Sequence, residues 1–341
     1  MEKENLAIIS NEKTFNINDK FFCDNIDMKS IPEGLSDSFN IELFLRKSKI
    51  ERASHKISLN KINLSGGLMN YLFKIWSRSK LHKKYLIISL SPFTFFASIL
   101  LFILRKKAYL YLRSDGYEEY RCYSKIFGPI IYHIMFIIST RITKVIACRS
   151  HLLNGKNGYV VSPSQLNEKW FLNRKSPNLK NIEILYVGRI KIEKGIFSLL
   201  NIIKKIRENV SLKIINSEKK YDQKLNSKNV KIIHHQNEND SIIEIYDDHN
   251  IFILPSFTEA HPQVLDESLS RLRPVIIFPE ISHVKRERKG VYIADRNAKS
   301  LMEIVNFIMK NYLSIQNQMI HNKLPTKNSF LNEICEIIKN G

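Results

Sequence analysis

Two glutamates follow one apolar run closely enough to serve a single site. Glu259 comes soon after "NIFIL" (Asn250–Leu254), which has the composition of a buried strand, and Glu267 lies in the helical pattern that ends before Pro274. Seven residues separate the two carboxylates. In α/β folds, ligands bind beyond the carboxyl ends of the strands. We therefore expect Glu259 at the mouth of a ligand-binding cleft and Glu267, two turns along the helix, facing the same opening.

A second segment, "YVGRIKIEKG" (Tyr186–Gly195), places two cations at another strand end. Gly188 ends the predicted strand, and Gly195 begins a helical pattern. Arg189 and Lys194 flank the loop between them. Cations beside a helix N-terminus can bind a diphosphate, because their charges and the backbone N–H groups converge on one anion. Taken alone, the segment fits a glycine turn with solvated cations better.

The order and spacing of these segments are more specific than either alone. "YVGRIKIEKG", about sixty residues of α/β pattern and then "PSFTEAHPQVLDE" resemble the retaining glycosyltransferases of the GT-B fold, family 4 (glycosyl transferases group 1). "GVYIADRNAKSLMEIV", from Gly290, is similar to the family's next segment. The resemblance extends from Glu183 to Ile308, and the N-terminal half matches only in general pattern.

The resemblance implies roles for individual residues. Arg189 and Lys194 would bind the diphosphate of a nucleotide-sugar donor. Gly188 has no side chain that would block the close approach of the diphosphate. Glu259 would contact the donor sugar, and these two cations with Glu259 form the implied catalytic set. Glu267 would accept hydrogen bonds from the ribose, since a vicinal diol offers two donors. Further donor contacts are implied at Ala260, His261, Pro262, Gln263 and Val264, and near the base at "IIHHQ", which contains His234.

The implied chemistry needs no metal and no other cofactor. Cleavage of the sugar–phosphate bond builds negative charge on the departing diphosphate, which two fixed cations and a helix N-terminus would stabilise. The leaving phosphate is the implied base for the acceptor hydroxyl, with retention at the anomeric carbon. No protein nucleophile is assigned.

The sequence departs from the family pattern at several positions. Ala260 and His261 stand in the usual E-G-F-P signature, where His261 could bind the donor or simply pack, and Leu272 replaces a usual glycine. After the first strand, "SNEKTFNIND" replaces a Gly-rich loop. "LRSDG" replaces a usual His-Asp, which makes Arg113 and Asp115 candidates for the acceptor side. An Asp-Gly turn capped by the nearby arginine is an equal alternative.

Composition limits the class of protein. The 341 residues suit two domains, and the composition is globular. The net charge of +20 favours a polyanionic partner or an anionic membrane, although a merely solvated basic surface has nearly equal weight. The four cysteines form no CxxC pair, which argues against a zinc or redox site. Free thiols and an N-terminus unlike a signal peptide fit a cytoplasmic protein.

One apolar stretch, Tyr85–Leu104, is long enough to span a bilayer. Pro92 interrupts it beside two serines, so we predict a buried strand (Tyr85–Leu90), a turn and an apolar helix (Thr94–Lys107). A transmembrane helix is the less favoured reading, and a helix lying on a membrane surface remains open.

Apolar runs alternate with helical patterns along both halves, which predicts parallel α/β sheets. We expect two doubly wound Rossmann-like domains facing each other across a cleft. The boundaries are an acceptor-binding domain at 1–164, a linker at 165–181, a nucleotide-sugar-binding domain at 182–320 and a C-terminal helix at 321–341 that packs back on the first domain. Asp247 and Asp248, at the end of a helical pattern, are expected to be solvated.

These inferences lead to one principal hypothesis. The chain is expected to move a sugar, as a hexosyltransferase, from a nucleoside-diphosphate-sugar to a glycan or lipid-linked acceptor in cell-surface polysaccharide synthesis. We place it in the cytoplasm, peripheral on the cytoplasmic face of the inner membrane, with no nucleic-acid partner. The alternatives are a nucleotide-sugar epimerase of the same fold, a non-enzymatic polyanion-binding protein, and an inactive relative.

Overall fold

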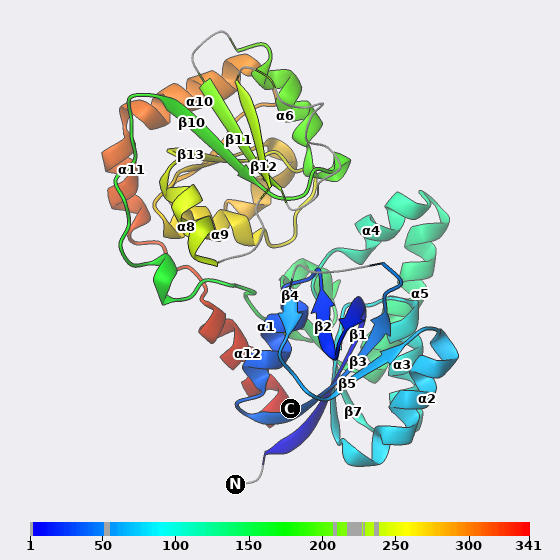
Figure 1. Cartoon of the computed structure of the whole chain (residues 1–341). Helices are drawn as coiled ribbons and strands as arrows, with labels where there is room; N and C mark the ends of the chain where they lie inside the picture. Colours follow the sequence, from blue (N-terminus) through cyan, green and yellow to red (C-terminus); the bar gives the residue numbers. More distant parts are fainter. Residues whose placement is uncertain (1–2, 51–54, 207–209, 217–226, 228, 235–238) are drawn as a thin grey trace. The chain divides into compact units, whose positions relative to one another are not determined.

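The computed structural model describes residues 3–50, 55–206, 210–216, 227, 229–234 and 239–341 (Figure 1). The chain forms two compact units. The first contains Met1–Pro163 and the returning segment Asn328–Gly341, and the second is Ser164–Lys327. Residues 165–181 therefore lie in the second unit, where Trp170 is buried in the hydrophobic core.

The first unit is built on a parallel sheet with strand order β5-β3-β1-β6-β7-β8-β9. The strands are β1 (Glu4–Ile17), β3 (Phe39–Lys47), β5 (Ile62–Ser65), β6 (Lys84–Ile88), β7 (Lys107–Leu112), β8 (Lys144–Ala147) and β9 (Tyr159–Val160). The buried stretches of the central strands, such as Leu6–Ile9 of β1 and Tyr85–Ile88 of β6, are apolar because both faces of the sheet are covered. A parallel α/β unit with reversing strand order is doubly wound, as predicted.

The first strand is much longer than expected. "SNEKTFNIND" continues β1 to Ile17, and β1 then turns back into β2 (Lys20–Cys23), which pairs with it in antiparallel orientation. β4 (His55–Ile57) extends this ribbon. Asn18 and Asp19 form the turn with positive φ values of 47° and 59°, a conformation that Asn and Asp tolerate best among residues with a Cβ.

Helices cover the first sheet on two sides (Figure 1). α2 (Leu68–Arg78), α3 (Pro92–Ile103) and α5 (Phe127–Ile142) lie side by side on one face. α1 (Asp27–Leu35) and the final helix α12 (Lys327–Asn340) lie on the other, with the short α4 (Gly116–Tyr123) following β7. The α12 backbone accepts a hydrogen bond from Tyr109 of β7 through Ile338.

The apolar stretch Tyr85–Leu104 divides into a strand and a helix, as predicted. The Ser91 hydroxyl accepts from the Thr94 N–H and the Thr94 hydroxyl accepts from the Ser91 N–H, so a capping box begins α3 at Pro92. Within the described residues, no helix is both long and apolar enough to span a bilayer.

The second unit has a parallel sheet with strand order β12-β11-β10-β13-β14-β15. Its strands are β10 (Ile182–Val187), β11 (Val210–Asn216), β12 (Val230–His234), β13 (Ile251–Leu254), β14 (Val275–Ile277) and β15 (Val291–Ile293). Its helices include α6 (Ile196–Ile203), α8 (Asn239–Asp247), α9 (Gln263–Ser270), α10 (Ala298–Lys310) and α11 (Tyr312–Met319). The strand order reverses between β10 and β13, which makes this position the topological switch point.

The expectation that Asp247 is solvated is wrong. Asp247 is buried and accepts two hydrogen bonds from the Arg271 guanidinium, at 2.9 and 2.6 Å. Arg271 also donates to the carbonyl oxygens of Trp170, Leu172 and Asn173. A buried charge is stable only when its partners satisfy it, so the end of α8 buries its carboxylate against this arginine. The pair thereby fastens the segment at 170–173 to the ends of α8 and α9.

Leu272, in place of the family's glycine, has a φ of 56°. This left-handed conformation is costly for a residue with a Cβ. The structure therefore shows why glycine suits this position: the chain must turn sharply between α9 and β14.

Candidate functional site

The candidate donor site lies where β10 and β13 end, at the switch point of the second sheet. Both loops that follow these strands carry predicted site residues, namely Arg189 and Lys194 after β10 and Glu259 after β13. The helices that follow strands on either side of a switch point leave in opposite directions, which opens a crevice for a ligand.

Lys194 and Glu259 meet across this point. The Lys194 Nζ lies 2.6 Å from Glu259 Oε1, and the Ser256 hydroxyl donates to the same oxygen at 2.7 Å. The side chains are 23% and 11% exposed, so the pair is largely shielded from water. Coulomb attraction is stronger in such surroundings than on an open surface. The two residues were predicted separately, and the fold brings them into contact.

Gly195 makes this approach sterically feasible. It has a φ of +66°, and a Cβ placed on it would lie 1.8 Å from the carbonyl oxygen of Pro255. The Phe257 N–H donates to the Glu193 carbonyl oxygen at 2.9 Å, which joins the same two loops through the backbone. Only glycine allows the start of α6 to pack this closely against the loop after β13.

Arg189 lies at the exposed end of the β10 loop. Its backbone carbonyl accepts a hydrogen bond from the Tyr186 hydroxyl at 2.9 Å. A Cβ on Gly188 would come within 2.7 Å of that same hydroxyl, so glycine leaves room for the bond. Tyr186 thus anchors the backbone of the loop, while the Arg189 side chain remains accessible to an anion.

An arginine that the sequence reasoning missed fixes the loop that carries Glu259. Arg296 donates to the Pro255 carbonyl oxygen at 3.0 Å and to both carboxylate oxygens of Glu280, at 2.8 and 2.9 Å. Its guanidinium also lies over the rings of Phe257 and Phe278, 4.2 and 4.3 Å from the centroids. The hydrogen bonds from Arg296 lower the pKa of Glu280. The segment "ADRNAKS" resembles a segment of the family, but nothing in its sequence indicates that its arginine contacts this loop.

Glu267 lies on α9 and accepts a hydrogen bond from the buried Tyr246 hydroxyl, at 2.8 Å. Burial raises the pKa of Glu267 to about 7; the bond from Tyr246 opposes this shift and the neighbouring Asp266 charge adds to it. Burial also keeps the pKa of Tyr246 well above its usual value, so this hydroxyl remains a donor. Tyr246 was missed because an aromatic residue in a helical pattern reads as ordinary core.

The segment between the two glutamates, residues 260–266, contains both buried and partly exposed residues. The side chain of His261 is buried, with Nε2 3.3 Å from Asp266 Oδ2, and Asp266 is paired with Arg288 at 2.7 Å. This placement favours packing for the His261 side chain. α9 begins at Gln263 after Pro262, without a side-chain cap. Pro262 therefore supplies no side-chain acceptor to the first N–H groups of the helix, which include that of Val264.

The remaining donor prediction concerns His234, at the end of β12. His234 ends β12, which parallel pairing places beside β11. Its side chain and the rest of "IIHHQ", residues 235 and 236, lie outside the described residues. A role in recognising the base stays a prediction.

The two candidates for the acceptor side lie in the first unit and point to different partners. Arg113 forms an ion pair with Asp27 of α1, at 2.9 Å. Asp115 caps α4: its Oδ1 accepts from the N–H groups of Tyr117 and Glu118, at 2.9 and 3.3 Å. The alternative foresaw an Asp-Gly turn capped by the arginine, but the cap comes from Asp115 itself, and Arg113 pairs with Asp27 instead.

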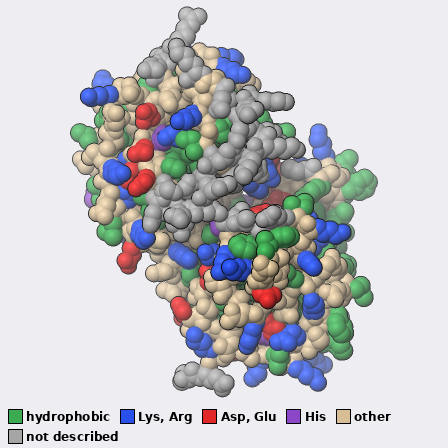
Figure 2. All heavy atoms as spheres, viewed as in Figure 1, with side chains coloured by type: hydrophobic (Ala, Val, Ile, Leu, Met, Phe, Trp, Pro, Cys, Tyr) green, Lys and Arg blue, Asp and Glu red, His purple; other side chains and the backbone are tan. Residues whose placement is uncertain are grey.

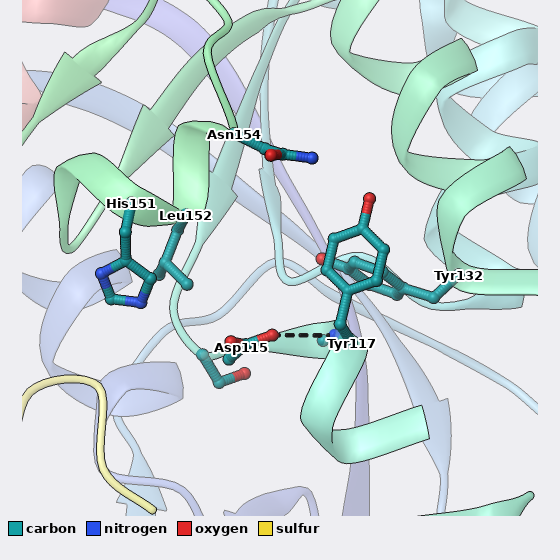
Figure 3. Close-up of a pocket in the computed structure, with 8 residues that line it drawn as sticks. Asp115, Tyr117, Tyr132, His151, Leu152 and Asn154 are labelled. Carbon is teal, nitrogen blue, oxygen red and sulfur yellow. Dashed lines mark hydrogen bonds between the residues drawn. The ribbon is translucent and has the colours of Figure 1, made fainter. Parts of the chain in front are cut away.

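A pocket of about 320 Å³ opens beside this cap (Figure 3). His151 and Leu152 stand on one side and the rings of Tyr117 and Tyr132 on the other, with Asp115 between them. Gly116 is required here, because a Cβ would lie 2.0 Å from the Tyr132 ring. Aromatic rings beside polar groups can stack on a ligand while hydrogen bonds orient it.

A comparison with known protein families matches the part of the chain that carries the candidate donor site. Residues 168–324 match the family model described as Glycosyl transferases group 1. The match includes both strand-end loops and both glutamates. No curated protein gives a significant match.

Solved structures resemble the chain along nearly its whole length. Sucrose-phosphate synthase from Thermosynechococcus elongatus is 15% identical, with a TM-score of 0.68, and the match covers 99% of each chain. HepE from Anabaena, in complex with UDP, is 11% identical with a TM-score of 0.73, covering 99% of this chain and 100% of that one. WaaG, a glycosyltransferase involved in lipopolysaccharide biosynthesis, is 13% identical with a TM-score of 0.67, covering 98% and 100%.

At these identities the structural likeness establishes the fold, and the family match supports assignment as a glycosyltransferase. The chain has the GT-B fold of two Rossmann-like domains, and its residues 168–324 match the model of the glycosyl transferases group 1 family.

Proposed function

We propose that this chain transfers a sugar from a nucleoside-diphosphate-sugar to a glycan or lipid-linked acceptor, with retention and without a metal. The observation that carries the proposal is the meeting of Lys194 and Glu259 at the switch point, within the region that matches the family. UDP is the first nucleotide to test, because the HepE neighbour contains it.

In the proposed reaction, the bond between the anomeric carbon and the diphosphate oxygen breaks, and its electron pair leaves with the diphosphate. Arg189 and Lys194 stabilise the charge that develops there. The acceptor hydroxyl forms the new bond on the same face and passes its proton to the departing phosphate. Glu259 holds Lys194 in place before the donor arrives and contacts the sugar.

Glu267 would bind the ribose hydroxyls in its ionised form. Tyr246 donates to one carboxylate oxygen, Oε2, and Oε1 has no hydrogen bond to another described side chain. With a pKa of about 7, the carboxyl group is partly protonated in the free protein. Hydrogen bonds from a diol favour the carboxylate, so donor binding should release a proton.

Thermal-shift measurements with UDP, GDP and ADP test the donor site. We expect one nucleotide to raise the Tm of the wild type and to raise it less in Glu267→Ala. Glu303→Ala, an exposed glutamate on α10 of the same unit, is the matched control and should respond like the wild type. Absence of a shift with every nucleotide, in folded protein, would count against the donor site.

For the acceptor we propose the pocket beside α4. Its aromatic rings and carboxylate suit a hydroxyl-rich ligand, and it lies in the unit that does not carry the donor loops. Asp115→Asn keeps an oxygen for the helix cap but removes the charge. The expected result is a higher KM for acceptor with unchanged affinity for the nucleotide. An unchanged acceptor KM would remove this pocket from the proposal.

Two rivals make different predictions. An epimerase would convert the donor sugar without any acceptor. A polyanion-binding protein would bind nucleic acid in a salt-sensitive manner that survives Glu267→Ala. As a glycosyltransferase of cell-surface polysaccharide synthesis, the protein would work on the cytoplasmic face of the membrane, where lipid-linked acceptors are found.

A further inference from the structure

Three neighbouring helices of the first unit turn apolar side chains outward. α2 and α3 are in contact through the rings of Tyr71 and Phe93, 5.5 Å apart, and α3 and α5 through the hydroxyls of Ser98 and Ser139, 3.2 Å apart. We call their outer surface the apolar face. It consists of Met69, Phe73, Trp76, Phe96, Phe102, Ile103, Phe127, Ile130, Ile131, Ile134 and Ile138.

Folding does not require these side chains to be apolar. α5 already packs its inner side in the core through Tyr132, Met135 and Phe136. On its outer side, Ile130 and Ile134 are 52% and 53% exposed. A helix on the surface of a soluble domain normally presents polar residues there. An apolar surface that spans three helices indicates a partner that covers it.

The charge close to the apolar face is predominantly positive, and the acidic exceptions Glu118 and Glu119 lie on α4, which packs against α5. Residues 52–167 contain eighteen Lys and Arg but only three acidic residues, Asp115, Glu118 and Glu119. None of the three lies on α2, α3 or α5. Exposed cations lie on these helices or close to their ends in the sequence, at Lys80, Lys83, Arg105, Lys107, Lys125 and Arg141. Figure 2 shows such blue side chains among the green ones over this part of the first unit.

We infer that the apolar face docks on an anionic lipid bilayer. Apolar side chains on helices lying in the interface enter the boundary of the acyl chains, while Lys and Arg at the rim meet the lipid phosphates. A second copy of the chain fits less well, because it would bring the two sets of bordering cations together. The inference deepens the proposed function and rests on it only for the presence of a lipid-linked acceptor.

Vesicle flotation tests the inference without using catalysis. Wild-type protein is mixed with vesicles of equal parts phosphatidylglycerol and phosphatidylcholine, or with phosphatidylcholine alone. We expect flotation with the anionic vesicles only, weakened by raised salt. The double variant Ile130→Ser/Ile134→Ser should lose about tenfold or more in vesicle partitioning, since two aliphatic side chains that would enter the bilayer are removed. Arg105→Gln/Lys107→Gln should lose about thirtyfold, at roughly 1 kcal/mol for each of the two cations near the surface.

The matched control is Phe307→Ser/Leu313→Ser in the second unit, where the two side chains are 50% and 70% exposed. This variant should float like the wild type. Circular dichroism and Tm show that each variant is folded. Wild-type protein that ignores anionic vesicles, or that floats equally after the α5 substitutions, would overturn the inference.

Sedimentation, which measures the oligomeric state, tests whether a second copy of the chain covers the apolar face instead. A dimer in solution that Ile130→Ser/Ile134→Ser dissociates would make the apolar face a self-interface and would also overturn the inference. Nucleotide binding is measured separately on the same samples. A protein that binds no nucleotide could therefore still float with anionic vesicles. A protein that does not float could still bind a nucleotide.

Discussion

Each unit places a cation and a carboxylate just beyond the end of a central strand, yet the two arrangements differ. In the second unit, Lys194 follows β10 and Glu259 follows β13, and they pair with each other across the switch point. In the first unit, Arg113 pairs with Asp27 of a different helix, while Asp115 caps the helix that it precedes. The ends of β7 and β8 are left with an open pocket.

The difference shows what strand order does to similar residues. At the switch point the flanking connections diverge, so charged side chains from two loops can meet there and face a ligand. β7 and β8 are neighbours on one side of the first sheet's own reversal, and the acidic residue there is used by the local backbone. The same residue types therefore pair with each other across the switch point in one unit, and in the other unit the carboxylate caps a helix beside a pocket.

The largest effect should come from breaking the support of the second unit. Arg271→Leu removes both hydrogen bonds to the buried Asp247 carboxylate, leaves only Arg273 at 3.7 Å, and frees the carbonyl groups of Trp170, Leu172 and Asn173. Loss of one member of a buried ion pair typically costs about 3–5 kcal/mol, and urea unfolding measures it. Arg121→Leu, which removes the exposed pair with Glu118 in the first unit, should cost less than about 1 kcal/mol. Equal losses would mean that the buried pair contributes nothing special.

Removal of the cation at each strand end tests the comparison directly. Lys194→Ala should lower kcat/KM for sugar transfer by roughly 10²–10³-fold, because a fixed charge beside the leaving diphosphate is lost. Arg113→Ala should change the rate of donor hydrolysis, measured without acceptor, by no more than a factor of a few. The reason is that Arg113 pairs with Asp27 and does not lie in the donor loops. Lys204→Ala, an exposed lysine at the end of α6, is the control. A small effect at Lys194 would sink the assigned role.

Two glycines separate backbone strain from close packing. Gly195 and Gly155 both have positive φ, at 66° and 75°, but only Gly195 has an atom within 2 Å of a built Cβ. Both alanine variants should pay about 1 kcal/mol or more for the left-handed conformation. Gly195→Ala should lose a further 1–3 kcal/mol or so from overpacking. Equal Tm values for the two variants would show that the loops at the switch point can separate freely.

The smallest effect is a pH dependence confined to the second unit. Since the pKa of Glu267 is about 7 and the ribose requires the carboxylate, nucleotide affinity should rise with pH. At pH 6 it should be about tenfold below its plateau above pH 8. Glu267→Gln should remove this dependence, measured by calorimetry. Tyr246→Phe deletes the bond that lowers this pKa, so it should move the midpoint upward; a midpoint that stays in place would contradict the role of Tyr246.

Much of the fold follows from local patterns. The division of Tyr85–Leu104 into strand and helix is visible in Ser91 and Pro92, because capping depends on neighbours in the chain. The length of β1 was not visible, since the polar residues after Ser10 resemble a loop until β2 is available as a partner. Strand pairing is a long-range property, and alternation alone does not reveal it.

The candidate site divides in the same way. Glu259 and Glu267 stand out by their spacing, and Lys194 by its place before Gly195. Their supporting residues do not stand out. Arg296 reaches the Glu259 loop across 41 residues of sequence to Pro255, and Tyr246 reaches Glu267 across 21.

By itself, the sequence determined two alternating α/β units, a family resemblance in the second of them and a strongly basic first half. These properties depend on residue type and short-range spacing, which the chain carries before it folds. Only the tertiary structure decided that Lys194 pairs with Glu259, that Asp247 is buried, and that the apolar side chains of α2, α3 and α5 share one surface. Strand order and packing set those distances, and neither is encoded in any single segment.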